Sequence, residues 1–186
     1  RNQNGQETRW EYDDRGNLTK IINAEGNVST LTYNQYGQVI ESSDFNGNKT
    51  VFSYTPAGDV ASVTDALGNV TRFEYDGLGR MTKRINPLGV EFAYQYDLND
   101  NLLEISGPLG YTVQFVYDLN NRLVTQIDPK GGQIQLEYDQ SENLTAQINE
   151  LGFRTSFEYG LMNEKFKKID PEGRVTTYGY TPRYSV

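Results

Sequence analysis

The chain has 186 residues, of which 36% are hydrophobic and 12% aromatic, with 14 Tyr and 18 Gly. It contains no His and no Cys, which excludes Ser-His-Asp and Cys-His nucleophilic sites, zinc cages, haem ligation and disulfide bonds. A formal net charge of −8 argues against nucleic acid or an anionic membrane as a partner, and no apolar run reaches the roughly 20 residues of a spanning helix.

A repeat of 21 residues organises the whole chain. A Tyr recurs at this interval without insertion or deletion, at Tyr12, Tyr33, Tyr54, Tyr75, Tyr96, Tyr117, Tyr138, Tyr159 and Tyr180. A Gly precedes each Tyr by seven residues, at Gly5, Gly26, Gly47, Gly68, Gly89, Gly110, Gly131, Gly152 and Gly173. The domain organisation expected from this pattern is one array over residues 1–186, with about nine copies of the repeat.

The first predicted element of each copy is a strand that ends at the Tyr. A large apolar residue stands two positions earlier, at Trp10, Leu31, Phe52, Phe73, Tyr94, Phe115, Leu136, Phe157 and Tyr178. The residue between them is mostly polar, as with Glu11 and Glu74. This alternation predicts a half-buried strand with the aromatic rows packed on one face.

A turn is predicted directly after each Tyr. In Tyr12-Asp13-Asp14-Arg15-Gly16 the Gly suits the left-handed residue that closes a type I hairpin with a bulge. Later copies place Asp100, Asn121, Glu142 and Asn163 at this position. Asp and Asn tolerate the left-handed conformation better than Glu does, so we expect the turn at Glu142 to be the most strained.

The second predicted strand begins six residues after the Tyr with another apolar row: Leu18, Val39, Val60, Met81, Leu102, Leu123 and Leu144. Lys165 breaks this row, and Phe166 beside it is a possible substitute. A branched aliphatic residue follows, as Ile85, Ile127, Ile148 and Ile169 but as Val63 and Ile105 one position earlier. This irregularity leaves open which face of the second strand is covered.

A second turn completes each copy, as in Asp128-Pro129-Lys130-Gly131 and Asp170-Pro171-Glu172-Gly173. Asp or Asn at the first position, Pro at the second and Gly at the fourth are typical of a type I turn. If both turns reverse the chain, the result is an antiparallel meander of about 17 or 18 strands that must curl as its twist accumulates. A parallel β-helix with one coil per repeat is the alternative.

The unit Tyr-Asp-x-x-Gly-Arg/Asn-Leu, followed by Asp-Pro-x-Gly and aromatic-x-Tyr, resembles the YD repeat of the rearrangement-hotspot (Rhs) family, which is shared with toxin-complex components and teneurins. The resemblance covers the whole chain. It implies a β-hairpin array that spirals as part of a hollow shell, and a partner set of the rest of that shell and an enclosed C-terminal toxin or effector domain. It implies a bacterial protein that is secreted or at the cell surface, with delivery by a secretion system as one route. The rows of Tyr, Gly and aromatic residues are then structural residues of a shell wall.

Other interpretations of single motifs are weaker. Asp76, Asp97, Asp118 and Asp139 share one turn position, where a bond to the backbone explains them better than a catalytic pair does. Residues 97–101 begin like a calcium loop, but Leu102 and Pro108 occupy positions that need Gly and Glu. We therefore expect no enzyme activity, cofactor or metal site.

Two further patterns remain as alternatives. Exposed aromatic rows can stack on sugars, so an adhesin or carbohydrate-binding array is the second hypothesis, with a glycan as its partner.

Lys165, Lys167 and Lys168 form a basic cluster that is most simply a solvated strand face. Because the repeat continues to both ends without a capping element, we also expect a segment of a longer array.

Overall fold

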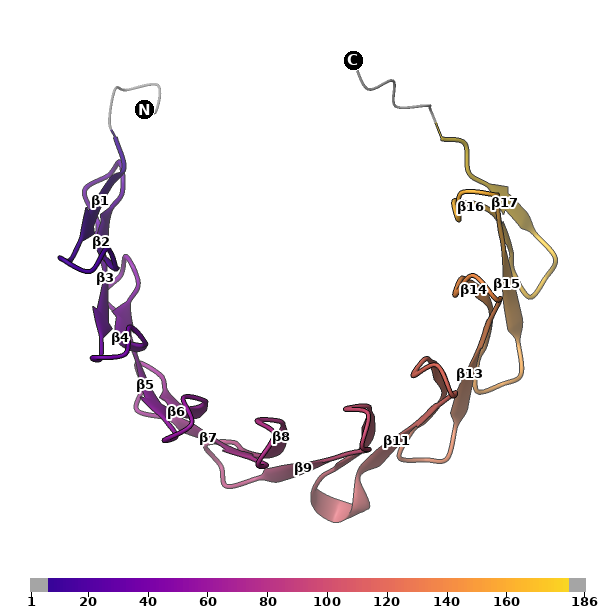
Figure 1. The fold of residues 1–186 in the computed structure, drawn as a ribbon, viewed down its shortest axis with the longest axis horizontal. Coiled ribbons are helices and arrows are strands. Elements are labelled where there is room, and N and C mark those ends of the chain that lie inside the picture. Colours follow the sequence, from indigo (N-terminus) through magenta and orange to yellow (C-terminus); the bar gives the residue numbers. More distant parts are fainter. Residues whose placement is uncertain (1–6, 181–186) are drawn as a thin grey trace. The chain divides into compact units, whose positions relative to one another are not determined.

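The computed structural model describes residues 7–180, and nearly all regular structure in it is β (Figure 1). The chain divides into two compact units, residues 1–93 and 94–186, with strand β9 beginning in the first and ending in the second. The strands of the first unit are β1 Arg9–Tyr12, β2 Leu18–Ile22, β3 Val28–Tyr33, β4 Val39–Ser43, β5 Lys49–Tyr54, β6 Val60–Thr64, β7 Val70–Tyr75, β8 Met81–Ile85 and the start of β9 Glu91–Tyr96. Those of the second are the end of β9, β10 Leu102–Ser106, β11 Thr112–Tyr117, β12 Leu123–Ile127, β13 Gln133–Tyr138, β14 Leu144–Ile148, β15 Arg154–Tyr159, β16 Lys165–Ile169 and β17 Val175–Thr177. A single 3-10 turn, η1, covers Pro108–Gly110.

Within each unit, consecutive strands pair in antiparallel fashion, from β1 to β9 in the first and from β10 to β17 in the second. The predicted all-β fold of antiparallel hairpins is thereby confirmed. A parallel β-helix is excluded, because successive coils of that fold pair with each other through parallel strands, whereas all the strand pairs here are antiparallel.

A β-bulge precedes the repeat Tyr in seven of the hairpins. In the pairing of β5 with β6, Ser53 lies opposite Ser62, whereas Tyr54 lies opposite Val60, so the register shifts by one residue. The same shift occurs before Tyr12, Tyr33, Tyr75, Tyr117, Tyr138 and Tyr159. A bulge leaves one residue outside the ladder and strengthens the local twist.

The register also shows which side chains share a face, because directly opposed residues point the same way. Val63 lies opposite Phe52, and Ile105 lies opposite Val113, two residues from Phe115. These aliphatic residues therefore share the face of the aromatic row, which we call the aromatic face. Ile85 lies opposite Arg72, beside Phe73 in the sequence, so it points to the other face. Ile127 does the same, opposite Gln114. The irregular spacing of this row is thus a real change of face.

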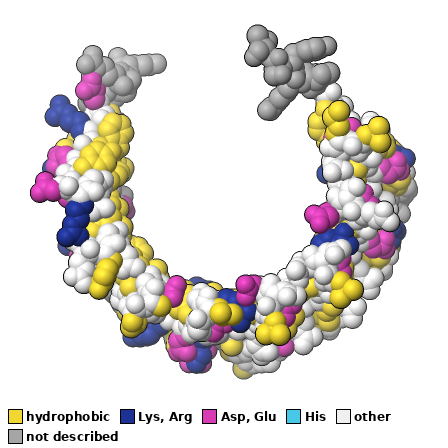
Figure 2. Space-filling view, in the orientation of Figure 1, with side chains coloured by type: hydrophobic (Ala, Val, Ile, Leu, Met, Phe, Trp, Pro, Cys, Tyr) yellow, Lys and Arg dark blue, Asp and Glu magenta, His cyan; other side chains and the backbone are white. Residues whose placement is uncertain are grey.

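Cross-strand ion pairs line the opposite face, which we call the ion-pair face. Their members are Glu11–Lys20, Glu41–Lys49, Lys83 with Glu74 and Glu91, Glu137–Arg154 and Glu158–Lys167. In the first unit, Figure 2 shows charged side chains along one side of the ribbon and hydrophobic side chains along the other. Individual exposed pairs of this kind contribute little to stability.

Each unit is a single layer of sheet. Among residues 7–180, only Val113 and Ala146 are buried hydrophobic side chains. Ala146 is fully buried because the Glu137–Arg154 pair joins β13 to β15 across β14, where Ala146 lies between Glu137 and Ser156. Without a second layer, the sheet depends on its hydrogen-bonded ladder and on its turns.

Candidate functional site: the tyrosine turns and the aromatic face

Two rows of five-residue turns border the sheet and have almost the same geometry. We call the turns after each repeat Tyr the tyrosine turns, at residues 13–17, 34–38, 55–59, 76–80, 97–101, 118–122, 139–143 and 160–164. Those before the next strand are the glycine turns, at 23–27, 44–48, 65–69, 86–90, 107–111, 128–132, 149–153 and 170–174. In nearly all of them the first residue donates its N–H to the fifth carbonyl, and the fourth donates to the first carbonyl, as with Asp13, Gly16 and Asn17.

An Asp or Asn at the first turn position holds the loop from inside. The Oδ1 atom of Asp13 accepts the backbone N–H of Arg15 at 3.0 Å and that of Asn17 at 2.8 Å. Its Oδ2 atom accepts the side-chain amide of Asn17 at 2.9 Å. Local bonds of this kind explain why Asp and Asn favour turns.

These bonds lower the pKa of several of the turn carboxyls. The side-chain amide of Asn17 is the largest cause for Asp13, and the equivalent Asn residues do the same for Asp44, Asp65 and Asp139. For Asp76 and Asp118, the backbone N–H of the fifth turn residue is the largest cause of the lowered pKa. A carboxyl held in its ionised form is a poor general acid.

Two turns that begin with Gly show what this Asp or Asn contributes. In turn 160–164 the carboxylate of Glu164 lies in the space that a side chain at Gly160 would fill and accepts the N–H of Met162 at 2.9 Å. In turn 107–111 the fifth residue is Tyr111, which has no carboxylate or amide. There the bonding changes, and Tyr111 donates its N–H to Pro108.

The left-handed conformation occurs where the sequence predicts it, and at one unpredicted residue. Asp100, Asn121, Glu142 and Asn163 have φ of 66°, 61°, 67° and 62°. Leu109, in the altered turn 107–111, also has a positive φ, of 57°, followed by Gly110 at 77°. The expected strain at Glu142 is therefore accompanied by strain at Leu109, which the turn pattern did not predict.

Neighbouring tyrosine turns are bonded to one another. In the first unit, Arg15 donates to the carbonyl of Gln35 at 3.0 Å, and Gln38 donates to that of Gly58 at 2.9 Å. In the second unit, Asn101 donates to Asn121 at 2.8 Å and Asn143 to Asn163 at 3.1 Å. The fifth residue of the turn, or Arg15 at the third position, thus joins each of these repeats to the next.

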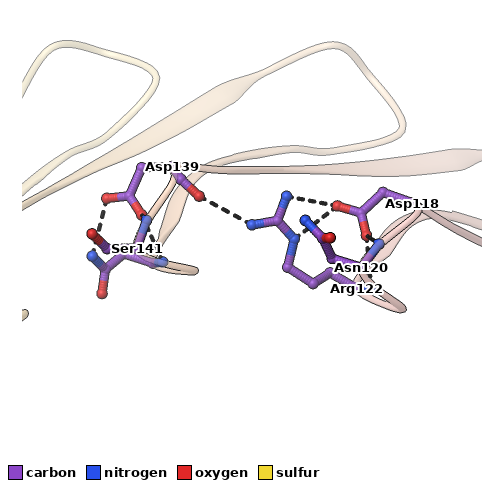
Figure 3. A network of polar contacts seen from close by, with 6 residues as sticks. Asp118, Asn120, Arg122, Asp139 and Ser141 are labelled. Carbon is purple, nitrogen blue, oxygen red and sulfur yellow. Dashed lines mark hydrogen bonds and ion pairs between the residues drawn. The ribbon is translucent and has the colours of Figure 1, made fainter.

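Arg122 makes a link of this kind through several contacts at once (Figure 3). Its guanidinium pairs with Asp118 at 2.7 Å and donates to the carbonyl of Asp139 at 3.0 Å. It also lies over the ring of Tyr138, 4.9 Å from the centroid. One side chain therefore holds its own turn, the next turn and the next repeat Tyr together.

The repeat Tyr hydroxyls form a second link between copies. Tyr33, Tyr54, Tyr75 and Tyr180 each donate to the carbonyl of the residue 15 positions earlier, Leu18, Val39, Val60 and Lys165, at 2.7 to 2.9 Å. The ladder between β2 and β3 ends at Lys20 opposite Thr30, so Leu18 lies beyond it. The Tyr thus supplies a donor to a carbonyl outside the ladder between these two strands. Burial, followed by the charge of Asp59, raises the pKa of Tyr75.

Most residues of the predicted rows lie where the repeat places them, on the aromatic face or at the left-handed turn position. The Gly residues from Gly26 to Gly173 have positive φ, and Gly5 lies outside the described residues. Trp10, Tyr12 and Tyr180 are more than half exposed, whereas the other repeat Tyr and aromatic-row residues are partly covered. Lys165 of the basic cluster lies 5.3 Å from the ring of Phe157 and 5.0 Å from that of Tyr178, so it belongs to the aromatic face.

No group of three or more His, Cys, Asp or Glu residues in the described part of the chain is placed to hold a metal ion. The described residues also include no helix long and apolar enough to cross a membrane.

Comparison with known proteins assigns the repeat to a family. A family model described as Teneurin YD-shell matches residues 2–183. The chain belongs to the YD-shell family. No curated protein matches the sequence.

Solved structures share the YD-shell fold. The chain superposes on TcdB2-TccC3 without its hypervariable C-terminal region with a TM-score of 0.77 and 16% identity, covering 98% of this chain and 11% of that one. A TcdB2-TccC3 structure gives 0.67 and 16%, covering 95% and 12%. A Tc holotoxin pore from Photorhabdus luminescens gives 0.63 and 14%, covering 87% and 12%. The chain thus spans little more than a tenth of the length of these proteins.

Proposed function

We propose that this chain is a wall segment of a larger YD shell that encloses a toxin or effector domain for secretion and delivery. The observation that carries the proposal is the combination of a single-layer sheet with links that recur from copy to copy. Links such as Tyr54 to Val39 and Gln38 to Gly58 join neighbouring repeats through backbone carbonyls. Such a sheet can extend by adding copies, as a wall requires.

The proposed partners are the remainder of the same shell and an enclosed C-terminal domain. Two features support this assignment. The chain corresponds to 11% of the TcdB2-TccC3 chain, and that protein is described with a hypervariable C-terminal region. The repeats themselves, about nine over residues 1–186, belong to one array in this proposal. A shell of this type acts outside the cell that makes it, so we assign the protein to the secreted or cell-surface class.

A structural and non-catalytic role agrees with the state of the carboxylates. Turn residues Asp76, Asp118 and Asp139 have lowered pKa values and accept bonds from their own loops. Each therefore has a structural partner that explains its position. In the proposed wall, the Tyr, aromatic and Gly rows have packing and turn roles.

Limited proteolysis of the parent protein tests the proposal. If the shell encloses its cargo, the cargo domain resists protease in the intact protein and becomes sensitive when the Tyr hydroxyl links are removed by Tyr33→Phe, Tyr54→Phe and Tyr75→Phe together. Tyr36→Phe, at an exposed turn position, is the matched control and should leave the protection unchanged. If protease digests the cargo domain of the intact protein as fast as that of the triple variant, enclosure is contradicted.

A further inference from the structure

Two lysines of the basic cluster on β16 lie on the aromatic face of the second unit. Lys168 lies opposite Phe157 of β15 in the ladder, and the Lys165 ammonium lies over the rings of Phe157 and Tyr178, at 5.3 and 5.0 Å from their centroids. Phe166 shares this face, because it stands two residues from Lys168 on the same strand. We call Phe157, Lys165, Phe166, Lys168 and Tyr178 the lysine patch.

Both lysines depart from the repeat at positions where the preceding copies carry neutral residues. Lys165 occupies a row that is otherwise apolar, with Leu144 one copy earlier. Lys168 corresponds to Gln147 and Gln126 in the two preceding copies. The strands β15 and β16 nevertheless pair in the same register as β13 and β14. The fold therefore requires no positive charge at either position.

No carboxylate in the described part of the chain neutralises these two cations. Neither Lys165 nor Lys168 forms an ion pair among residues 7–180, and both are partly buried. The acidic residues nearest in the sequence have other partners, in the pairs Glu158–Lys167, Asp170–Arg174 and Glu172–Arg174 and in the bond from the Met162 N–H to Glu164. The lysine patch thus carries two uncompensated positive charges in a chain of net charge −8.

The chemistry of the lysine patch favours an anion that also has apolar parts. Each ammonium is a compact charge that pairs with one carboxylate, and the rings of Phe157, Phe166 and Tyr178 supply apolar surface beside them. The backbone N–H groups of a paired strand are engaged in the ladder, so this face lacks the N–H cradle that binds phosphate at helix N-termini. The net charge of −8 repels a long polyanion more than it repels a short segment with a few carboxylates.

We propose that the lysine patch binds an acidic peptide segment of a partner protein. Lys165 and Lys168 each pair with a carboxylate of that peptide, and its apolar side chains pack on the rings of Phe166 and Tyr178. This inference is independent of enclosure, because the lysine patch lies within the second unit and is present whatever the shell contains.

NMR titration of the isotope-labelled 186-residue chain tests this inference. The probe is an acetylated eight-residue peptide with Glu at alternate positions and Leu or Ser between them, and the comparison peptide has Gln in place of each Glu. We expect the Glu peptide to shift the side-chain signals of Lys165, Phe166 and Lys168, and the Gln peptide to bind about tenfold more weakly. Raising the NaCl concentration to about 0.5 M should weaken binding of the Glu peptide, because salt screens exposed charges.

Two substitutions that return β16 to the repeat pattern separate binding from folding. Lys168→Gln should weaken binding of the Glu peptide about three- to tenfold, and combining it with Lys165→Leu should weaken binding further. The preceding copy carries these residues as Gln147 and Leu144, so the double variant should keep the circular dichroism spectrum of the parent chain.

Arg84→Gln is the matched control, because Arg84 occupies the repeat position of Lys168 and lies opposite Phe73 on the aromatic face of the first unit. Met81 stands there in place of the second cation. This variant loses the same charge and should bind the Glu peptide unchanged. Four results would overturn the proposal: no response to the Glu peptide, equal affinity for the Glu and Gln peptides, equal affinity of the double variant and the parent chain, or tighter binding of a sulfated tetrasaccharide at the same signals.

Discussion

At the residue scale, the fourth position of each turn carries the strongest conformational demand. Among the described residues, twelve Gly at this position have positive φ, and Asp100, Asn121, Glu142 and Asn163 adopt the same conformation there with a side chain. Leu109 adopts it at the third position of its turn. Glu142 keeps the usual turn bond, with its N–H 3.2 Å from the carbonyl of Asp139. Its backbone is therefore in place and strained, since a long side chain at this φ has no compensating local bond.

We predict that Glu142→Gly raises the free energy of unfolding by about 1 kcal/mol, because Gly adopts this φ without steric cost. Urea denaturation of the two chains measures the difference. Gly152→Ala, at the same position of the next turn along the chain, should lower the free energy of unfolding by a similar amount. A lower midpoint for Glu142→Gly would show that the Glu side chain stabilises the turn.

The hydroxyl group of the repeat Tyr is a second source of stability at the scale of single residues. We predict that Tyr75→Phe lowers the free energy of unfolding by about 1 kcal/mol, because the Val60 carbonyl loses the donor that lies 2.9 Å away. Tyr36→Phe should have almost no effect, since Tyr36 is an exposed turn residue. Equal urea midpoints for the two variants would show that the hydrogen bond from the Tyr75 hydroxyl does not stabilise the fold.

Part of this residue pattern could be predicted from the sequence. The alternation around Tyr54 and the left-handed position of Gly58 follow from local rules of strand and turn. The bond from Tyr54 to Val39 could not be predicted, because it depends on the bulge that shifts the register between β5 and β6. Leu109 was missed because its conformation results from the absence of an Asp or Asn at Gly107, two residues earlier.

At the element scale, the turns act as small electrostatic units. The carboxylates of Asp13, Asp44, Asp65, Asp76 and Asp118 all have pKa values below their ordinary value of 3.8. A pKa that is lower in the folded chain means that the folded state binds fewer protons than the unfolded state. Their contribution to stability is therefore complete above the unfolded pKa and is lost as the pH falls through the folded one.

We predict that the urea midpoint is nearly constant from neutral pH to about pH 5 and falls below about pH 4. A variant with Asn at these five positions should show a smaller fall, because Asn keeps the Oδ1 acceptor and does not titrate. Turns 23–27 and 86–90 already use Asn in this way. If both chains lose stability in parallel below about pH 4, other groups cause the acid sensitivity.

At the scale of the whole molecule, the repeat period determines what can be removed. Deleting residues 44–64, one full period, joins Ser43 to Asp65, which occupies the same turn position as Asp44. We predict that this chain folds cooperatively with a β-type circular dichroism spectrum, because each copy interacts mainly with its neighbours. Deleting 44–63 adds one residue before the turn and should destabilise the sheet more, since a slip of one residue exchanges the two faces. Equal urea midpoints would contradict the role of the register.

The shell proposal also belongs to this scale, because a wall has meaning only within the larger protein. The described sheet has an aromatic face and an ion-pair face and very few buried side chains, so each unit exposes both of its surfaces. Electron microscopy of the full-length parent protein tests the central claim most directly. The proposal predicts a closed shell whose wall contains these repeats, with additional density for the cargo inside. An open sheet, or a closed shell without internal density, would contradict enclosure as the function of this chain.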